Sequence, residues 1–291
     1  MPTANSMREE HPVQYFRTSA LVLVCVGSFL GVTALPASKT EPSLYKTKYR
    51  VINLHRHCAV ATEPAIRSEL DVMDSVGMSV VTILDAGGTT DNLAAWITLQ
   101  KKYPERLVVF LKPSFAKAKE KTFFTDLVRD LEKAAKMGVK GVKIWKDLGM
   151  YIRDGSGKLL KADDSRLDPF WAKCGELGLP VLIHTADERE YWYPLTANSL
   201  HYGLRADKDQ HYNNPDMPKW EELLRQRDAV LKRHPKTQFI GAHLGSLSLD
   251  LKQLGKVFEK YPNFSVDTAA RLRILGRLNP PAVRDFFVKD Q

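Results

Sequence analysis

After Tyr49 the sequence repeats one unit: a short apolar run, a loop, and a segment of mixed apolar and charged residues. Most of the apolar runs are rich in Val, Ile, Leu or Phe, as strands covered on both faces are. Strands that alternate with helices predict a parallel α/β sheet, either open and doubly wound or closed into an eight-stranded barrel. The predicted strands are Val51–Cys58, Ser79–Ala86, Leu107–Ser114, Val139–Trp145, Val181–Thr185, Phe239–Leu244 and Phe264–Thr268.

Helices are expected between these strands, and several carry recognisable end signals. Ser248 stands where a helix N-cap is expected, and Asp168-Pro169 reads as a cap followed by proline at the first helical position. Gly77, Gly138 and Gly178 follow helical segments, where a left-handed closing residue is favoured. The predicted helices include Glu63–Val76, Asn92–Lys102, Phe123–Met137, Trp220–Arg233 and Leu249–Lys260.

The amino-terminal segment differs from the rest of the chain. Ala20–Leu35 is uncharged and apolar or small throughout, and Arg17 precedes it. The run is shorter than the roughly 20 residues that span a bilayer, but it suits the apolar region of a secretory signal, with cleavage after Ala34 or Ala37. We therefore expect residues 1–37 to be a signal peptide or an uncleaved signal anchor, and residues 38–291 to form the folded domain. The protein is then exported, periplasmic or secreted, or anchored to the membrane by an uncleaved segment.

The net charge does not indicate a nucleic-acid partner. Lys and Arg total 43 against 34 Asp and Glu, a formal charge of +9, but acidic residues are interleaved with the basic ones. No basic run carries aromatic residues at stacking intervals, as a single-strand binding groove does. No GxGxxG follows the first predicted strand and no GxxxxGK[ST] occurs, so a glycine loop that binds nucleotides is not indicated. We expect a small-molecule substrate.

Polar residues interrupt the predicted strands close to their carboxyl ends. A parallel barrel places its active site at these ends, and neutral imidazoles are good ligands for divalent metals. Alternation puts His55 and His57 on the same face of the first strand, close enough to share one ion. The sequence therefore favours a metal site with a position left for water over histidines that serve packing alone. The strand-end residues are His55, His57, Lys143, His184, His243 and Asp267, with Arg271 close behind.

Other candidates have weaker contexts. His234 precedes Pro235 at a helix end and is predicted to be a surface residue. Cys58 follows the His-x-His pair, but alternation turns it to the other face, which favours packing over metal binding. The long connection from His184 to Phe239 contains several Tyr, Trp and His residues. It suits a substrate lid or a subunit contact, and a plain surface excursion equally well.

The motifs VINLHRHC, GVKGVKIWKDLG, LPVLIHTAD, FIGAHLG and NFSVDTAAR, in this order, resemble the amidohydrolase superfamily. The resemblance is to the amidohydrolase-related branch that includes the aminocarboxymuconate semialdehyde decarboxylases. It covers the chain from about residue 50 onward. It implies a distorted (β/α)₈ barrel of the TIM type that holds one or two divalent metal ions.

The resemblance also implies roles for individual residues. His55, His57 and His184 would be metal ligands, and His243 would act on the metal-bound water or be a further ligand. Lys143 lies where two-metal members carry a carboxylated lysine, which would add a second ion. Because this branch uses one metal, we favour an ordinary lysine that contacts substrate or forms a salt bridge. Asp267 and Arg271 would bind a substrate carboxylate or support the site.

The sequence departs from the family at its carboxyl end. The family has an essential aspartate after the eighth strand, whereas this chain ends at Lys289-Asp290-Gln291, after the helix that follows the seventh predicted strand. We therefore expect a barrel truncated after its seventh βα unit, with the eighth strand missing. Two open sheet edges would favour association into a homo-oligomer.

These inferences lead to three functional hypotheses. The first is a metal-dependent hydrolase in which a metal-bound water attacks a carbonyl-type substrate. The alternative is a metal-dependent decarboxylase or hydratase, with Arg271 or Lys143 holding the substrate carboxylate. The third is an inactive fragment or binding protein that lacks the eighth-strand aspartate. We expect zinc, although imidazole ligands also suit manganese and iron.

Overall fold

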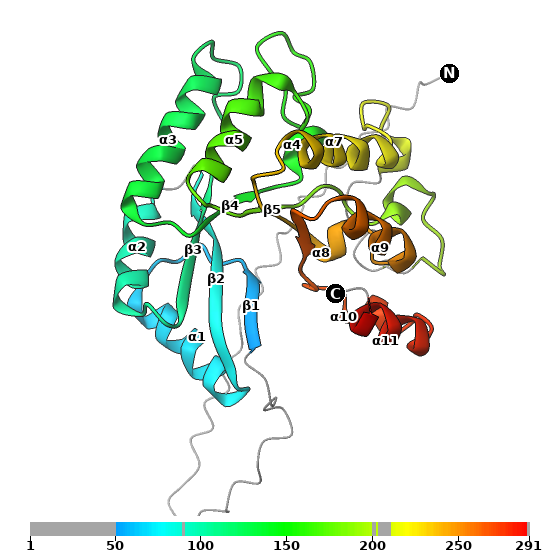
Figure 1. Cartoon of the computed structure of the whole chain (residues 1–291), viewed down its shortest axis with the longest axis horizontal. Helices are drawn as coiled ribbons and strands as arrows, with labels where there is room; N and C mark the ends of the chain where they lie inside the picture. Colours follow the sequence, from blue (N-terminus) through cyan, green and yellow to red (C-terminus); the bar gives the residue numbers. More distant parts are fainter. Residues whose placement is uncertain (1–50, 89–90, 200–201, 203–210, 290–291) are drawn as a thin grey trace, which may run out of the picture. The chain divides into compact units, whose positions relative to one another are not determined.

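Seven parallel strands form one sheet in a computed structural model that describes residues 51–88, 91–199, 202 and 211–289. The strands lie side by side in chain order, so each βα unit adds a neighbour to the one before it (Figure 1). The strands are β1 (Val51–Arg56), β2 (Met78–Gly87), β3 (Leu107–Lys112), β4 (Gly141–Ile144), β5 (Val181–Ile183), β6 (Phe239–Gly241) and β7 (Phe264–Val266).

The sheet curls without closing, which confirms the α/β fold of the TIM-barrel type that stops after its seventh βα unit. Every strand pairs in parallel with the next, and within the described residues β1 and β7 do not pair with each other. A cavity of about 410 Å³ lies at this seam, lined by Ile52–His55 of β1, by Val266–Ala269 at the end of β7, and by Phe287. The edge of β1 at the seam has no strand partner among the described residues, and Ile52 on this strand is 52% exposed.

Helices follow the strands and cover the outer face of the sheet, as α1, α2 and α3 show (Figure 1). Two of the predicted helices, Phe123–Met137 and Trp220–Arg233, have the predicted bounds. The longer helices are α1 (Glu63–Ser75), α2 (Leu93–Lys102), α3 (Phe123–Met137), α5 (Asp168–Glu176), α7 (Trp220–Arg233), α9 (Leu251–Lys260) and α11 (Pro280–Lys289). The short ones are α4 (Asp147–Met150), α8 (Ala242–Gly245) and α10 (Leu272–Leu275).

Two apolar clusters lie on the two faces of the sheet. The large cluster packs the helices against the strands and includes Trp96, Leu131 and Trp171, each fully buried. The small one lies inside the curl and contains Leu84, Phe110, Leu182 and Ala242. Because only the few inward side chains of short strands fill the interior, the polar residues that follow them remain free to gather at the carboxyl ends.

The helix-end predictions were right for the glycines and wrong for two caps. Gly77, Gly138 and Gly178 have positive φ, as predicted. Ser248 is not an N-cap: Asp250 caps α9 by accepting a hydrogen bond from the Gln253 N–H, which leaves the Ser248 hydroxyl to a buried carboxylate. Asp168 is the first residue of α5 rather than its cap, because Leu167 ends the preceding 3₁₀ turn in helical geometry.

The expected export segment, residues 1–37, lies outside the described residues, as do His11 and His201. Among the helices that the structure does describe, none combines the length and the apolar character needed to cross a membrane.

Candidate metal centre

Shifts in strand register near the ends of β1 and β2 orient the first polar residues of the site. The β1–β2 register shifts between Asn53 and Arg56, and the β2–β3 register shifts between Ile83 and Ala86. Such bulges bend a strand and redirect its side chains, and they often lie beside functional sites. They lie where His55 on β1 and Asp85 on β2 enter the site.

Carboxylates fix the tautomers of the two β1 histidines. The His55 Nδ1 lies 2.7 Å from Asp267 Oδ2, and the His57 Nδ1 lies 3.2 Å from Asp85 Oδ2. Because a carboxylate accepts hydrogen bonds, each neutral ring carries its proton on Nδ1 and presents a lone pair at Nε2. The two Nε2 atoms face each other at 3.2 Å. Two lone pairs at that distance repel one another unless a proton or a metal cation lies between them.

His243 is placed by a left-handed turn rather than by a strand. β6 ends at Gly241, and the next residues of α8, His243 and Leu244, have φ of 59° and 57°. Non-glycine residues in this region cost about 1–2 kcal/mol each, so the turn needs support. The sequence placed His243 inside a strand that ran to Leu244. The structure corrects this, because the left-handed turn ends β6 at Gly241, two residues before His243.

Asp267 supplies that support. Its Oδ1 accepts the backbone N–H of His243 at 2.7 Å and that of Ala269 at 3.1 Å, while its Oδ2 holds His55. The His243 Nδ1 in turn donates to the Ala269 carbonyl at 2.9 Å, which leaves the His243 Nε2 as an acceptor. One buried carboxylate, just after β7, therefore orients His55 of β1 and His243 after β6.

His184 follows β5 and completes the cluster. Its ring centroid is 4.6 Å from that of His243, and the His243 centroid is 4.5 Å from that of His55. The His184 Nε2 is buried and has no hydrogen-bond partner among the described residues. The structure thus brings together the four histidines that the sequence singled out.

Lys143 points into the same cluster from β4. It is 1% exposed, and its Nζ lies 3.4 Å from the His55 Nε2. Burial lowers the pKa of Lys143 to about 7, against the opposing fields of Asp267 and Asp85. Near neutral pH its amine is therefore divided between the charged and the neutral form.

Burial also favours the neutral form of His55, His184 and His243. It lowers the pKa of His55 despite the hydrogen bond to Asp267, and it lowers the pKa of His184 well below the usual value. The pKa of His243 falls to about 4, mainly through burial and against the hydrogen bond to Ala269. Neutral imidazoles are the form that binds metal ions.

The nitrogen atoms have the spacing of a metal site. In a tetrahedral site with bonds of about 2.0–2.1 Å, neighbouring ligand atoms lie about 3.3 Å apart. The 3.2 Å between the Nε2 atoms of His55 and His57 matches this value, and the buried His184 Nε2 lacks a partner. Among the described residues, the one group of three possible ligands whose atoms all lie within 4.8 Å of one another is His55, His243 and Asp267, but Asp267 already holds both histidines. The facing Nε2 atoms of His55 and His57, with the unpartnered His184 Nε2 in the same cluster, are therefore the candidate ligands for a divalent ion.

Arg271 lies beside the cluster with its charge already paired. Arg271 is 8% exposed, its guanidinium contacts the Glu188 carboxylate at 2.7 Å, and the same carboxylate accepts a hydrogen bond from the Ser248 hydroxyl at 2.6 Å. Burial, opposed by Arg271, raises the pKa of Glu188. The structure gives Arg271 and Asp267 supporting contacts within the protein, and their direct binding of substrate stays a prediction.

Sequence reasoning missed the partners of these residues. Asp85 was treated only as part of a predicted strand, and Glu188 was not singled out, although Asp85 interrupts an apolar strand and Glu188 follows one. The prediction for His234 was wrong: it is 9% exposed, because its Nε2 lies 3.0 Å from the Asp168 carboxylate across two helices. Cys58 packs against the large core, as expected.

The inserted connection after β5 also has a buried polar anchor. His211, which had no assigned role, is 4% exposed, and its Nε2 lies 2.8 Å from Asp187 Oδ2. Lys146, just after β4, donates to the same carboxylate at 2.6 Å. The described part of the insertion is therefore tied to the carboxyl ends of β4 and β5.

Family comparison identifies the chain. A family model described as amidohydrolase matches residues 62–289. The chain belongs to the amidohydrolase family. The match confirms the resemblance found in the strand-end motifs, although it begins after His55 and His57. No curated protein sequence matches this amidohydrolase-family chain.

Solved structures agree with this family assignment. A Staphylococcus aureus protein assigned as an amidohydrolase shares 14% identity, with a TM-score of 0.53 over 83% of this chain and 84% of that one. 2,6-Dihydroxybenzoate decarboxylase from Rhizobium shares 15% identity, with a TM-score of 0.50 over the same shares. At these identities the likeness shows a common fold.

The lowered histidine pKa values predict an acid-sensitive apoprotein. An unfolded histidine has a pKa near 6.5, so the unfolded chain binds more protons between that pH and the folded value of about 4 for His243. The stabilisation is full above pH 6.5 and is lost as the pH falls toward 4. Between pH 7.5 and 5.5 we expect His243 to account for about 1 kcal/mol of lost stability.

Urea unfolding in EDTA at the two pH values measures this loss. The His243→Asn variant is the comparison, since asparagine tolerates a left-handed backbone and does not titrate. It should lose less stability on acidification than the natural protein by the stated amount. Equal losses for the two proteins would show that His243 is protonated as readily in the folded state as in the unfolded one.

Proposed function

We propose that this chain is a metal-dependent decarboxylase that acts on a carboxylated small molecule, with His55, His57 and His184 holding one divalent ion. The observation that carries the metal site is the facing pair of Nε2 lone pairs at 3.2 Å, each fixed by a carboxylate on the far side of its ring. A divalent ion bound there would polarise an oxygen of the substrate. Zinc is the ion we propose first, and manganese is the main rival.

The buried cation of the site supports a carboxylated substrate. Lys143 lines a cavity of about 380 Å³, and its burial without a paired carboxylate among the described residues suits it to receive an anion. The similarity in fold to the 2,6-dihydroxybenzoate decarboxylase from Rhizobium also favours this reaction over hydrolysis. The proposal therefore rests on the chemistry of Lys143 and on the family together.

The residues of the site divide the proton chemistry. In decarboxylation the bond to the carboxyl group breaks, carbon dioxide leaves, and the electron pair left on the substrate carbon takes up a proton. Lys143, with a pKa of about 7, can supply that proton in its ammonium form. The neutral His243 presents an acceptor Nε2, so it can orient a substrate hydroxyl or receive a proton.

Hydrolysis is the second candidate, because the matching family model is described as amidohydrolase. In that reaction His243, whose Nε2 can accept a proton, would assist an attacking water. Release of carbon dioxide separates the two activities, because it accompanies decarboxylation and not hydrolysis.

The test uses protein loaded with Zn²⁺ or Mn²⁺ and 2,6-dihydroxybenzoate labelled with ¹³C at its carboxyl group. Metal-dependent release of labelled carbon dioxide, lost in Lys143→Met, supports the decarboxylase. Cleavage of a simple anilide without carbon dioxide release supports the hydrolase instead. If protein with bound Zn²⁺ or Mn²⁺ catalysed neither reaction, both proposals would be rejected for these substrate classes.

A further inference from the structure

The cavity above Lys143 contains a second cation that no carboxylate neutralises. The cavity lies at the carboxyl ends of β3 and β4, and its walls include Lys112, Lys143, Trp145, Phe115 and Ile152. Two lysines in one hollow are costly unless anions enter it, because their charges repel and both lose water. The only acidic residue among the lining residues is Asp147, which is exposed at the rim.

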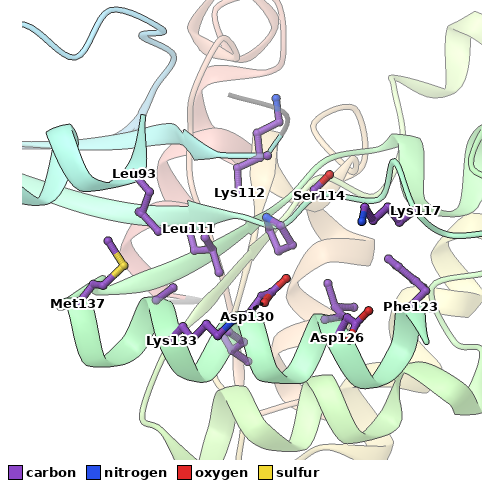
Figure 2. A pocket seen from close by; sticks show the side chains of 15 residues that line it. Leu93, Leu111, Lys112, Ser114, Lys117, Phe123, Asp126, Asp130, Lys133 and Met137 are labelled. Atoms are coloured by element: carbon purple, nitrogen blue, oxygen red, sulfur yellow. Dashed lines mark ion pairs between the residues drawn. The ribbon is translucent and has the colours of Figure 1, made fainter. Parts of the chain in front are cut away.

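Lys112 is the last residue of β3, and its side chain is held over an aromatic ring. Its Nζ lies 4.4 Å from the centroid of the Trp145 indole, a cation–π distance. Within the described residues it makes no hydrogen bond or ion pair with a carboxylate. Figure 2 shows the neighbouring hollow between β3 and α3, where Lys112 extends to the side away from Asp126 and Asp130.

Lys112 interacts electrostatically with one carboxylate at longer range, that of Asp85. Burial raises the pKa of Asp85, but His57 and Lys112 outweigh that effect and lower it overall. The Asp85 oxygens are engaged by His57 at 3.2 and 3.3 Å. Asp85 therefore belongs to the histidine cluster, and the N–H donors of the Lys112 ammonium group are left available to a ligand.

Trp145 contributes a second hydrogen-bond donor that has no acceptor in the part of the chain that the structure describes. Its indole Nε1–H is buried and has no acceptor among the described residues. An unsatisfied buried donor costs about 1–3 kcal/mol, which a bound acceptor would recover. The indole also lies beside the histidine cluster, since its ring centroid is 4.8 Å from that of His57.

We propose that Lys112 and the Trp145 N–H form an anion subsite, which binds a carboxylate of the ligand in front of the candidate metal-ligating histidines. Two donors without an acceptor of their own select an anion over a cation or an amide. Phe115 and Ile152 provide apolar walls, so the carboxylate should be carried on an apolar body such as a ring. Lys112 is then a specificity-determining residue. This inference rests on the proposed function only in taking the natural ligand to be the carboxylated substrate.

Binding of benzoate and of its neutral analogue benzamide to the full chain in EDTA tests the subsite without turnover. The readout is the Trp145 indole N–H resonance, assigned by its loss in Trp145→Phe. We expect saturable shifts with benzoate and at least 10-fold weaker binding of benzamide. Lys112→Met should weaken benzoate binding at least 10-fold, whereas Lys121→Met, which changes an exposed lysine outside the cavity lining, should leave it unchanged. Thermal unfolding of each variant checks that the fold is retained.

Three results would overturn the subsite: no shift of the Trp145 resonance with benzoate, equal binding of the two analogues, or unchanged benzoate binding by Lys112→Met. Loss of binding in Lys143→Met but not in Lys112→Met would place the anion at Lys143 alone and would also overturn it. These outcomes are independent of the proposed function. The absence of carbon dioxide release with normal benzoate binding would reject the decarboxylase and keep the subsite.

Discussion

Replacing His184 with alanine is expected to weaken the binding of Zn²⁺ by at least about 100-fold and to abolish metal-dependent activity. Loss of a residue that only orients a ligand typically costs 10–100-fold in metal affinity, so loss of a direct ligand should cost no less. His184 is buried, its Nε2 has no partner among the described residues, and its ring contacts His243. Removal therefore leaves His55 and His57 as the remaining pair of the proposed ligands.

Equilibrium titration with a competing chelator measures the affinity of the purified protein for Zn²⁺ and for Mn²⁺. His234→Ala is the matched control, because His234 is also largely buried but pairs with Asp168 away from the cluster. It should bind metal as the natural protein does. Unchanged affinity in His184→Ala, with a bound ion still present, would exclude His184 as a ligand.

The second large effect is expected at Asp267, where two substitutions should separate folding from metal binding. Asp267→Ala leaves three donors without their acceptor: the backbone N–H groups of His243 and Ala269, and the His55 Nδ1–H. At about 1–3 kcal/mol for each buried unsatisfied group, the loss of stability should be about 3 kcal/mol or more. The left-handed turn that carries His243 would lose its support.

Asp267→Asn should keep the fold and lose the metal. The amide oxygen can still accept the two backbone N–H groups, so stability should change by only about 1 kcal/mol. Its NH₂ group faces the His55 Nδ1, which must then become the acceptor and move its proton to Nε2. A protonated Nε2 cannot bind an ion, so metal affinity should fall about 10–100-fold.

Urea unfolding of the apoproteins and chelator titration with Zn²⁺ measure the two effects separately. The expected pattern is low stability in Asp267→Ala only, and weak metal binding in both variants. If Asp267→Asn bound zinc as tightly as the natural protein, the contact with Asp267 would not control the His55 tautomer. If Asp267→Ala unfolded like the natural protein, the turn at His243 would be supported by other contacts.

The sequence predicted the fold well because its signals are local. Runs of branched and aromatic apolar residues mark each strand, and the charged faces of α3 and α7 mark helices whose bounds match the prediction. The same locality explains why the sequence places His55, His57, His184 and His243 at one edge of the sheet, since each of them interrupts or follows an apolar strand. Parallel strands bring their carboxyl ends to one edge, so the four rings meet there.

The errors occurred where a residue's role depends on a distant partner. Ser248 has the residue type of a cap but donates to Glu188, sixty positions away in the chain. His234 was assigned to the surface, yet Asp168 of another helix covers it. No periodicity within a segment encodes which remote carboxylate a polar side chain will meet.

The order and type of residues alone determined that this chain forms a parallel α/β sheet of seven strands with histidines at its carboxyl edge. They also carried the family resemblance, because motifs survive as short contiguous strings. Only the tertiary structure decided which carboxylate holds which ring, that His243 lies on a left-handed turn, and that Lys112 and Trp145 share the cavity of Lys143. The physical reason is that tautomers, burial and unpaired donors arise from contacts between segments far apart in the chain, which exist only once the strands have assembled.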